Sequence, residues 1–119
     1  MIDPATFDIT RFEENAAAAA RLLRALANER RLMILCQLSG GEQSVGELQP
    51  LIGLSQSALS QHLSVLRSDG LVATRRDGLS IYYRIADPAA AQVMTTLAAI
   101  FCSDDVEKSN AQVPDRAEA

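Results

Sequence analysis

Apolar residues recur at helical spacing over most of the chain before residue 70. Residues 11–26 are rich in alanine and carry leucines toward their end, which predicts a first helix. Asn28 is a suitable N-cap for a second helix over residues 29–38. Because this second segment is apolar on nearly all sides, we expect it to be buried.

Two further helices follow, with a tight turn between them. Ser44 and Glu47 have the spacing of a capping box, which predicts the start of a third helix. After Gly53, Ser55 is a good N-cap for a fourth helix that continues to about residue 68. A helix, a short glycine-containing turn and another helix form the helix-turn-helix arrangement.

The pattern changes after residue 70. Residues 71–76 and 79–85 are rich in β-branched and aromatic side chains, and Asp77-Gly78 between them predicts the turn of a β-hairpin. Asp87-Pro88 predicts the start of a last helix that runs to about residue 103. One side of that helix is an apolar stripe about 120° wide, which we interpret as a dimer surface. Its members are Val93, Met94, Leu97, Ile100 and Phe101.

These elements together predict a mostly α-helical fold with one β-hairpin, which is a winged helix-turn-helix. We expect one such domain over residues 11–103, a lead-in over residues 1–10, and an acidic, disordered tail over residues 104–119. A chain of 119 residues with 48% hydrophobic residues has only a small core. Association with a second copy is therefore expected.

The fourth predicted helix has an uncharged polar face opposite its leucines. Residues 56–66 contain no Asp, Glu, Lys or Arg, whereas an ordinary solvated helix usually carries Lys and Glu on its outer face. Hydroxyl and amide side chains both donate and accept hydrogen bonds, which suits the base edges of the DNA major groove. The predicted DNA contacts on and beside this helix are Ser55, Gln56, Ser57, Ser60, Gln61, Ser64 and Arg67.

The charge of the chain is segregated. The net charge is −4, but residues 54–85 hold four Arg against two Asp, which is +2, and residues 86–119 hold six acids against two bases, which is −4. The basic part coincides with the predicted groove helix and hairpin. We therefore expect Arg75 and Arg76 of the hairpin to contact DNA as well. The alternative is a solvated strand edge that discourages strand pairing.

The residues do not support an enzyme, a membrane protein or a secreted protein. The sequence has no nucleophile–base constellation and no glycine-rich phosphate loop, so we do not expect an enzyme. It has no run of 18 or more apolar residues, and its first residues lack the form of a signal peptide. The expectation is a soluble, cytoplasmic protein that binds double-stranded DNA and no membrane.

Several segments in combination resemble the ArsR/SmtB family of small winged-helix repressors. The resemblance implies a homodimer clasped through the first and last helices. It also implies a two-fold symmetric DNA operator, released when an inducer binds. The segments that carry it are residues 26–31, 44–48, 54–63 and 66–71 and the pair Tyr82-Tyr83.

The metal sites of this family are not matched by the residues present. One family site needs a Cys-x-Cys-type cluster on the third helix, where residues 45–50 have no thiol. Another needs Asp and His pairs on the last helix, where residues 92–101 have no Asp, Glu or His. The single histidine, His62, lies in the fourth predicted helix. A zinc or nickel site requires three or four ligands, which these segments do not supply. We therefore expect no metal and no cofactor.

Cys36 and Cys102 match the sulfide- and persulfide-responsive branch of the family, the BigR/SqrR type, which carries one thiol on each of those two helices. Cys102 also lies about 140° from the centre of the last helix's apolar stripe, so it is not simply a core residue. Cys36 falls within the helix expected to be buried. The resemblance implies a redox dithiol, and the alternative is two inert, small hydrophobic residues.

The resulting hypothesis is a dimeric repressor released from operator DNA when reactive sulfur, a persulfide or polysulfide, bridges Cys36 and Cys102. Inserted sulfur atoms would span thiols too far apart for a direct disulfide. Two alternatives stay open. The same fold would sense oxidants, a metalloid or haem through these cysteines, or the protein would bind DNA constitutively with idle thiols.

Overall fold

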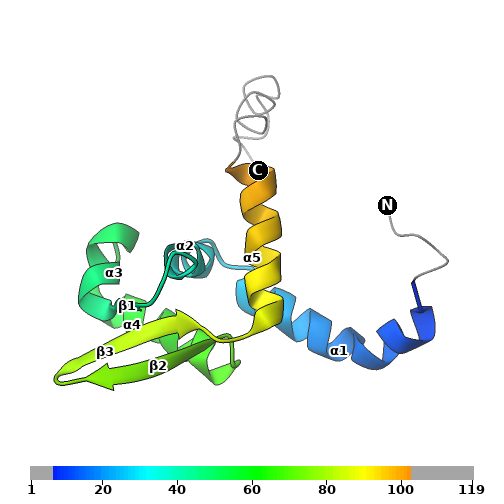
Figure 1. Cartoon of the computed structure of the whole chain (residues 1–119), viewed down its shortest axis with the longest axis horizontal. Coiled ribbons are helices and arrows are strands. Elements are labelled where there is room, and N and C mark those ends of the chain that lie inside the picture. The colour runs from blue at the N-terminus through cyan, green and yellow to red at the C-terminus, as the bar shows by residue number, and fades with distance from the viewer. Residues whose placement is uncertain (1–6, 103–119) are drawn as a thin grey trace.

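The computed structural model describes residues 7–102. Figure 1 shows α2, α3, α4 and the β2–β3 hairpin gathered in one body, with α1 and α5 extending away from it. The predicted mostly helical fold with a β-hairpin is confirmed. In chain order the elements are α1 (Ile9–Leu26), α2 (Glu29–Leu38), β1 (Gln43–Ser44), α3 (Val45–Ile52), α4 (Gln56–Ser68), β2 (Val72–Asp77), β3 (Ser80–Ile85) and α5 (Pro88–Phe101).

The N-caps of the helix-turn-helix are those that the sequence predicts. The side chain of Asn28 caps α2, and Ser44 with Glu47 forms a complete capping box at the start of α3. Gly53 then adopts φ +79°, a left-handed conformation that ends α3 and turns the chain. Ser55 caps α4 by accepting a hydrogen bond of 3.1 Å from a backbone N–H. The helix boundaries here follow from local hydrogen bonding.

Helix α1 begins earlier than predicted. Asp8 is its N-cap and accepts a hydrogen bond of 3.1 Å from the backbone N–H of Arg11. Ile9 and Thr10 are therefore helical, and their assignment to a lead-in was wrong. A capping carboxylate at this position outweighs the weak helix propensity of two β-branched residues.

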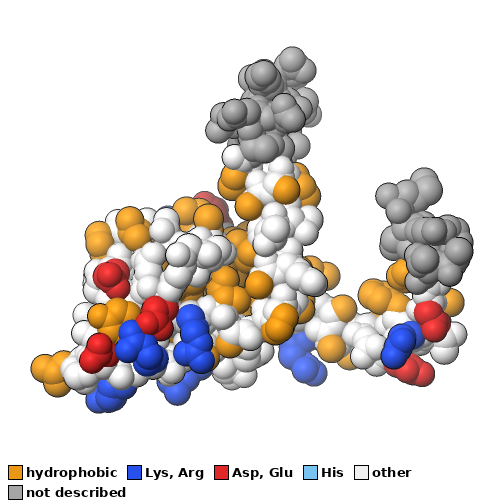
Figure 2. All heavy atoms as spheres, viewed as in Figure 1, with side chains coloured by type: hydrophobic (Ala, Val, Ile, Leu, Met, Phe, Trp, Pro, Cys, Tyr) orange, Lys and Arg blue, Asp and Glu red, His pale blue; other side chains and the backbone are white. Residues whose placement is uncertain are grey.

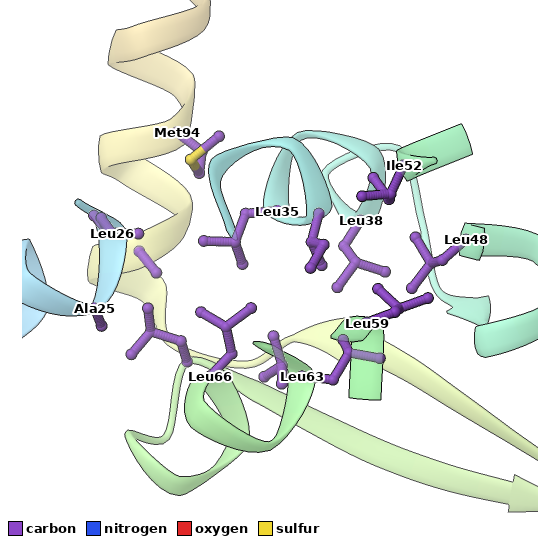
Figure 3. Close-up of a cluster of buried hydrophobic side chains, with 14 residues drawn as sticks. Ala25, Leu26, Leu35, Leu38, Leu48, Ile52, Leu59, Leu63, Leu66 and Met94 are labelled. Carbon is purple, nitrogen blue, oxygen red and sulfur yellow. The ribbon is translucent and has the colours of Figure 1, made fainter. Parts of the chain in front are cut away.

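Within residues 7–102, one core joins helices α1 to α5 and the sheet, and Figure 3 shows its side chains meeting between α2, α4 and α5. Leu59, Leu63 and Leu66 of α4 are completely buried, so the apolar back of that helix is confirmed. No buried polar or charged residue occurs within residues 7–102. The core residues are Ala25, Leu26, Ile34, Leu35, Leu38, Leu48, Ile52, Leu59, Leu63, Leu66, Leu71, Val72, Ala90 and Met94.

Helix α2 is less buried than its sequence suggests. Ile34, Leu35 and Leu38 face the core, but Met33 and Cys36 are exposed. The prediction of a helix buried on all sides was therefore wrong for its outer side. The neighbouring helix α5 extends away from the body and leaves that side uncovered (Figure 1).

The sheet has three strands in the order β1-β3-β2, and all pairs are antiparallel. Strand β1 was not predicted, because two residues are too few to show an alternating pattern. The hairpin turn is also shifted by one residue from the predicted Asp77-Gly78. Asp77 pairs with Ser80, so Gly78 and Leu79 form the turn. Gly78 has φ +64°, and a glycine at the first central position is typical of a type II′ turn.

Helix α5 ends at Phe101, with Cys102 as its C-cap residue, slightly before the predicted end. The apolar stripe of this helix divides in two. Met94 belongs to the chain's own core, which corrects its assignment to a dimer surface, whereas Ile100 and Phe101 are exposed. The tail predicted over residues 104–119 lies outside the described residues. Within residues 7–102, no helix has the length and apolar character needed to cross a membrane.

Candidate nucleic-acid interface and thiol site

The polar face of α4 lies on the surface of the protein. Its predicted DNA contacts are all exposed, and this is the face opposite the three buried leucines. The hydroxyl of Ser55 is used in the N-cap. Within the described part of the chain, the other predicted side chains on this face have no hydrogen-bond partner and are free to bind. These are Gln56, Ser57, Ser60, Gln61 and Ser64, with Arg67 in the last turn.

The orientation of this polar face is set by the elements around it. Helix α4 packs its leucines into the core, and α3 packs against both α2 and α4. Arg30 of α2 donates a hydrogen bond of 3.1 Å from Nη1 to the backbone carbonyl of Ile52 at the end of α3. The described residues do not form a metal site. His62 is half-buried at the edge of the α4 core face. Within residues 7–102, no three His, Cys, Asp or Glu side chains come together as a metal site would require.

The two arginines predicted on the wing differ in their surroundings. Arg75 donates a hydrogen bond of 2.9 Å from Nε to Oε1 of Glu42 and a second one from Nη2 to the same oxygen. Its guanidinium lies 4.8 Å from the ring centroid of Tyr82, and Nη1 lies 3.7 Å from a carboxylate oxygen of Asp77. The hydrogen bond from Arg75 lowers the pKa of Glu42 below its ordinary value and raises the pKa of Arg75. Arg75 is therefore engaged within the protein.

Arg76 points to the other face of the strand, because successive side chains of a strand alternate. It lies opposite Ile81 and is exposed, and it forms no ion pair with any residue in the range 7–102. Arg76 is therefore the wing arginine whose charge is unpaired in the described part of the chain. The sequence did not reveal the role of Glu42, because this residue is 33 positions from Arg75 and no local pattern connects them.

Cys36 and Cys102 line the same groove, which lies between α2 and α5 and has a volume of about 460 Å³. Cys36 belongs to the second half of α2, and Cys102 is held at the end of α5 by a hydrogen bond of 2.8 Å from its backbone N–H to the carbonyl of Ala98. Both are free cysteines and both are exposed. Their exposure contradicts the expected burial of Cys36, and whether the two thiols react stays a prediction.

Residues 28–74, from the cap of α2 into β2, match the family model described as bacterial regulatory protein, arsR family. The transcriptional activator HlyU of Vibrio cholerae is 46% identical over 98 residues, which cover 82% of this chain and 91% of that protein. The biofilm growth-associated repressor of Xylella fastidiosa is 46% identical over 93 residues, covering 78% and 82% of the two chains.

The chain belongs to the ArsR family.

Solved structures of ArsR-family relatives have the same fold. Reduced HlyU from Vibrio cholerae matches with a TM-score of 0.75 at 47% identity, covering 78% of this chain and 98% of that one. The repressor BigR from Xylella fastidiosa matches with a TM-score of 0.77 at 44% identity, covering 82% and 100%. The winged helix-turn-helix and the family resemblance are both confirmed. The protein is a DNA-binding regulator of transcription.

Proposed function

We propose that this ArsR-family protein is a dimeric repressor that binds operator DNA while its thiols are reduced and releases it when reactive sulfur bridges Cys36 and Cys102. The observation that carries the proposal is that both thiols line one groove between α2 and α5. They are the only two cysteines of the chain. A covalent link between them would join α2 directly to the end of α5.

The exposed polar face of α4 supports binding to base edges in the major groove. Arg67 and Arg76 would add contacts to phosphates, which position a protein on the duplex without reading its sequence. In a two-fold dimer, two copies of α4 separated by about 34 Å would enter successive major grooves. The wing would contact the DNA beside each half-site.

Exposed apolar side chains on the two projecting helices support a dimer. On α1, Ile9 is 59% and Phe12 48% exposed, and on α5, Ile100 is 46% exposed. Figure 2 shows hydrophobic side chains on both helices where they extend beyond the body. Since a soluble monomer rarely exposes large apolar patches, a second copy is the natural partner for these surfaces.

The bridging chemistry would proceed by thiol–persulfide exchange. One thiolate attacks the outer sulfur of a hydropersulfide R–S–SH and forms Cys–S–SH, while the electron pair of the broken S–S bond leaves on R–S⁻. The second thiolate then attacks the sulfur attached to carbon, which closes Cys–S–S–Cys and expels HS⁻. Alternatively, two Cys–S–SH groups condense to Cys–S–S–S–Cys and release H₂S. The longer bridge suits thiols whose Cα atoms lie beyond the roughly 7 Å limit of a disulfide.

The bridge would act on DNA binding through the position of α2. Helix α2 leads through residues 39–42 into β1 and then α3, and it packs directly against α3 and α4. A change in the angle between α2 and α5 would alter the separation of the two α4 helices in the dimer. A hundredfold loss of DNA affinity requires a preference of about 2.7 kcal/mol for the non-binding arrangement.

The test is a DNA-binding titration at fixed salt concentration with reduced, persulfide-treated, peroxide-treated, arsenite-treated and haem-treated protein. Persulfide should lower the affinity about a hundredfold, and mass spectrometry should find Cys36 and Cys102 linked with zero or more added sulfur atoms. Cys36→Ser and Cys102→Ser should bind DNA as the wild type does and keep binding it after treatment. Release from either variant at wild-type persulfide concentrations would contradict the proposal, as would release by arsenite or haem alone.

A further inference from the structure

The groove that holds the two thiols is apolar and carries no charge. Apart from the cysteines, only two polar side chains line it, and no Asp, Glu, Lys, Arg or His does so among residues 7–102. Its volume of about 460 Å³ lies within the range of small-molecule sites, which are mostly apolar. The lining residues are Leu32, Met33, Cys36, Ser39, Met94, Thr95, Leu97, Ala98, Phe101 and Cys102.

The two polar side chains of the groove are already engaged. Ser39 donates its hydroxyl proton to the carbonyl of Leu35 over 2.8 Å, and Thr95 donates its own to the carbonyl of Ala91 over 3.0 Å. Both bonds stay within the residue's own helical segment. A ligand in the groove would therefore meet sulfur and hydrocarbon, with no free hydroxyl proton and no charge to pair with.

The charged side chains of this region line a separate cavity. Glu42, Arg84 and Asp87 line a neighbouring space of about 490 Å³, which shares Ser39 and Thr95 with the groove but contains neither thiol. A carboxylate-bearing molecule would find its ionic partner there and not beside the sulfurs. The charged side chains and the two thiols therefore line different cavities.

We infer that the groove binds the carbon group of the sulfur donor and selects organic hydropersulfides whose carbon group is apolar and uncharged over donors that carry carboxylates. The inference rests on the proposed function, since it names the class of molecule that modifies the same two thiols. A thiolate in the groove attacks the outer sulfur of R–S–SH, takes it as Cys–S–SH, and releases R–S⁻, which leaves as the thiol R–SH after protonation by water.

The selectivity follows from desolvation. A carboxylate that entered the groove would lose its water without gaining a hydrogen bond or a counter-charge, which is unfavourable. Each methylene buried against the leucine and methionine side chains would instead strengthen binding about fourfold. An apolar group partly buried in the groove should raise the second-order rate of sulfur transfer at least about tenfold over a charged one.

The experiment compares benzyl hydropersulfide with glutathione hydropersulfide on the reduced full-length protein. The rate of sulfur gain at Cys36 and Cys102 is followed by mass spectrometry and divided by the rate of the same donor with N-acetylcysteine methyl ester, which removes the donors' intrinsic reactivity. We expect the benzyl donor to be favoured about tenfold or more. Met33→Lys places a counter-charge for the glutathione carboxylates in the groove, at a residue that is 42% exposed, and it should abolish this preference.

Leu51→Lys is the matched control, because Leu51 is 52% exposed on α3 and does not line the groove. It should retain the wild-type preference, and Met33→Leu should retain it as well. Equal normalised rates for the two donors, with both thiols modified, would overturn the groove inference while leaving the sulfur-sensing proposal standing. No sulfur gain with either donor would overturn both.

Discussion

The polar face of α4 and the groove between α2 and α5 are both exposed, but they are built in opposite ways. The face of α4 belongs to one helix, whose other side is fixed by three completely buried leucines. The groove arises between two helices that do not close on each other, and its walls are apolar. The polar face of α4 is held in a fixed orientation, which suits contact with base edges. The groove between α2 and α5 can change shape when a covalent bond links its two walls.

The largest expected effect tests the rigidity of α4. Leu63→Ala removes a completely buried side chain and should lower the free energy of unfolding by about 2–5 kcal/mol, measured by denaturant titration. Met33→Ala in the groove, at a residue 42% exposed, should cost far less. If the two variants lost similar stability, the contrast between a packed back and an open groove would be wrong.

The next effect concerns DNA affinity. Gln61→Ala on the polar face should weaken operator binding about tenfold, or about 1.4 kcal/mol, because the proposed amide contact to a base edge would be lost. The stability of the protein and its rate of reaction with persulfide should not change. Gln92→Ala, which removes an exposed amide from α5, is the control and should bind DNA as the wild type does.

A smaller effect should distinguish the two wing arginines. Arg76→Gln should weaken binding to all DNA sequences alike and reduce the slope of log affinity against log salt by about 1, since the proposed phosphate contact would be lost. Arg75→Gln should change this slope less, because Glu42 already pairs with Arg75 within the protein. Equal slopes for the two variants would show that Arg75 leaves Glu42 when DNA binds.

The smallest effect is a pH dependence of stability. Arg75 lowers the pKa of Glu42 below its ordinary value of 4.5, so the folded state favours the ionised carboxylate. The stabilisation is therefore fully present above pH 4.5 and is lost as the pH falls through the lower folded-state pKa. Denaturant titrations of wild type and Glu42→Gln should differ slightly at pH 7 and converge in acid. A difference that grew in acid would have the wrong sign.

The parts of this protein that were predicted correctly depend on near neighbours in the sequence. Helix caps such as Asn28 and Ser55 satisfy backbone groups two or three residues away, and the buried face of α4 follows from helical spacing. Two errors were local, at the Asp8 cap of α1 and in the register of the hairpin turn, and the others came where distant segments decide the outcome. Strand β1 exists because Gln43 and Ser44 pair with β3, and the exposure of Cys36 depends on where α5 lies.

The sequence by itself determined the helices, the hairpin, the polar face of α4 and the presence of two cysteines, because periodicity, caps and residue chemistry are local properties. Only the tertiary structure decided that Cys36 and Cys102 line one groove. Among residues 7–102, it also decided that this groove has no charged lining residue and that Arg75 is paired whereas Arg76 is not. These features are contacts between segments far apart in the chain. They depend on how the helices and strands pack, which no local pattern encodes.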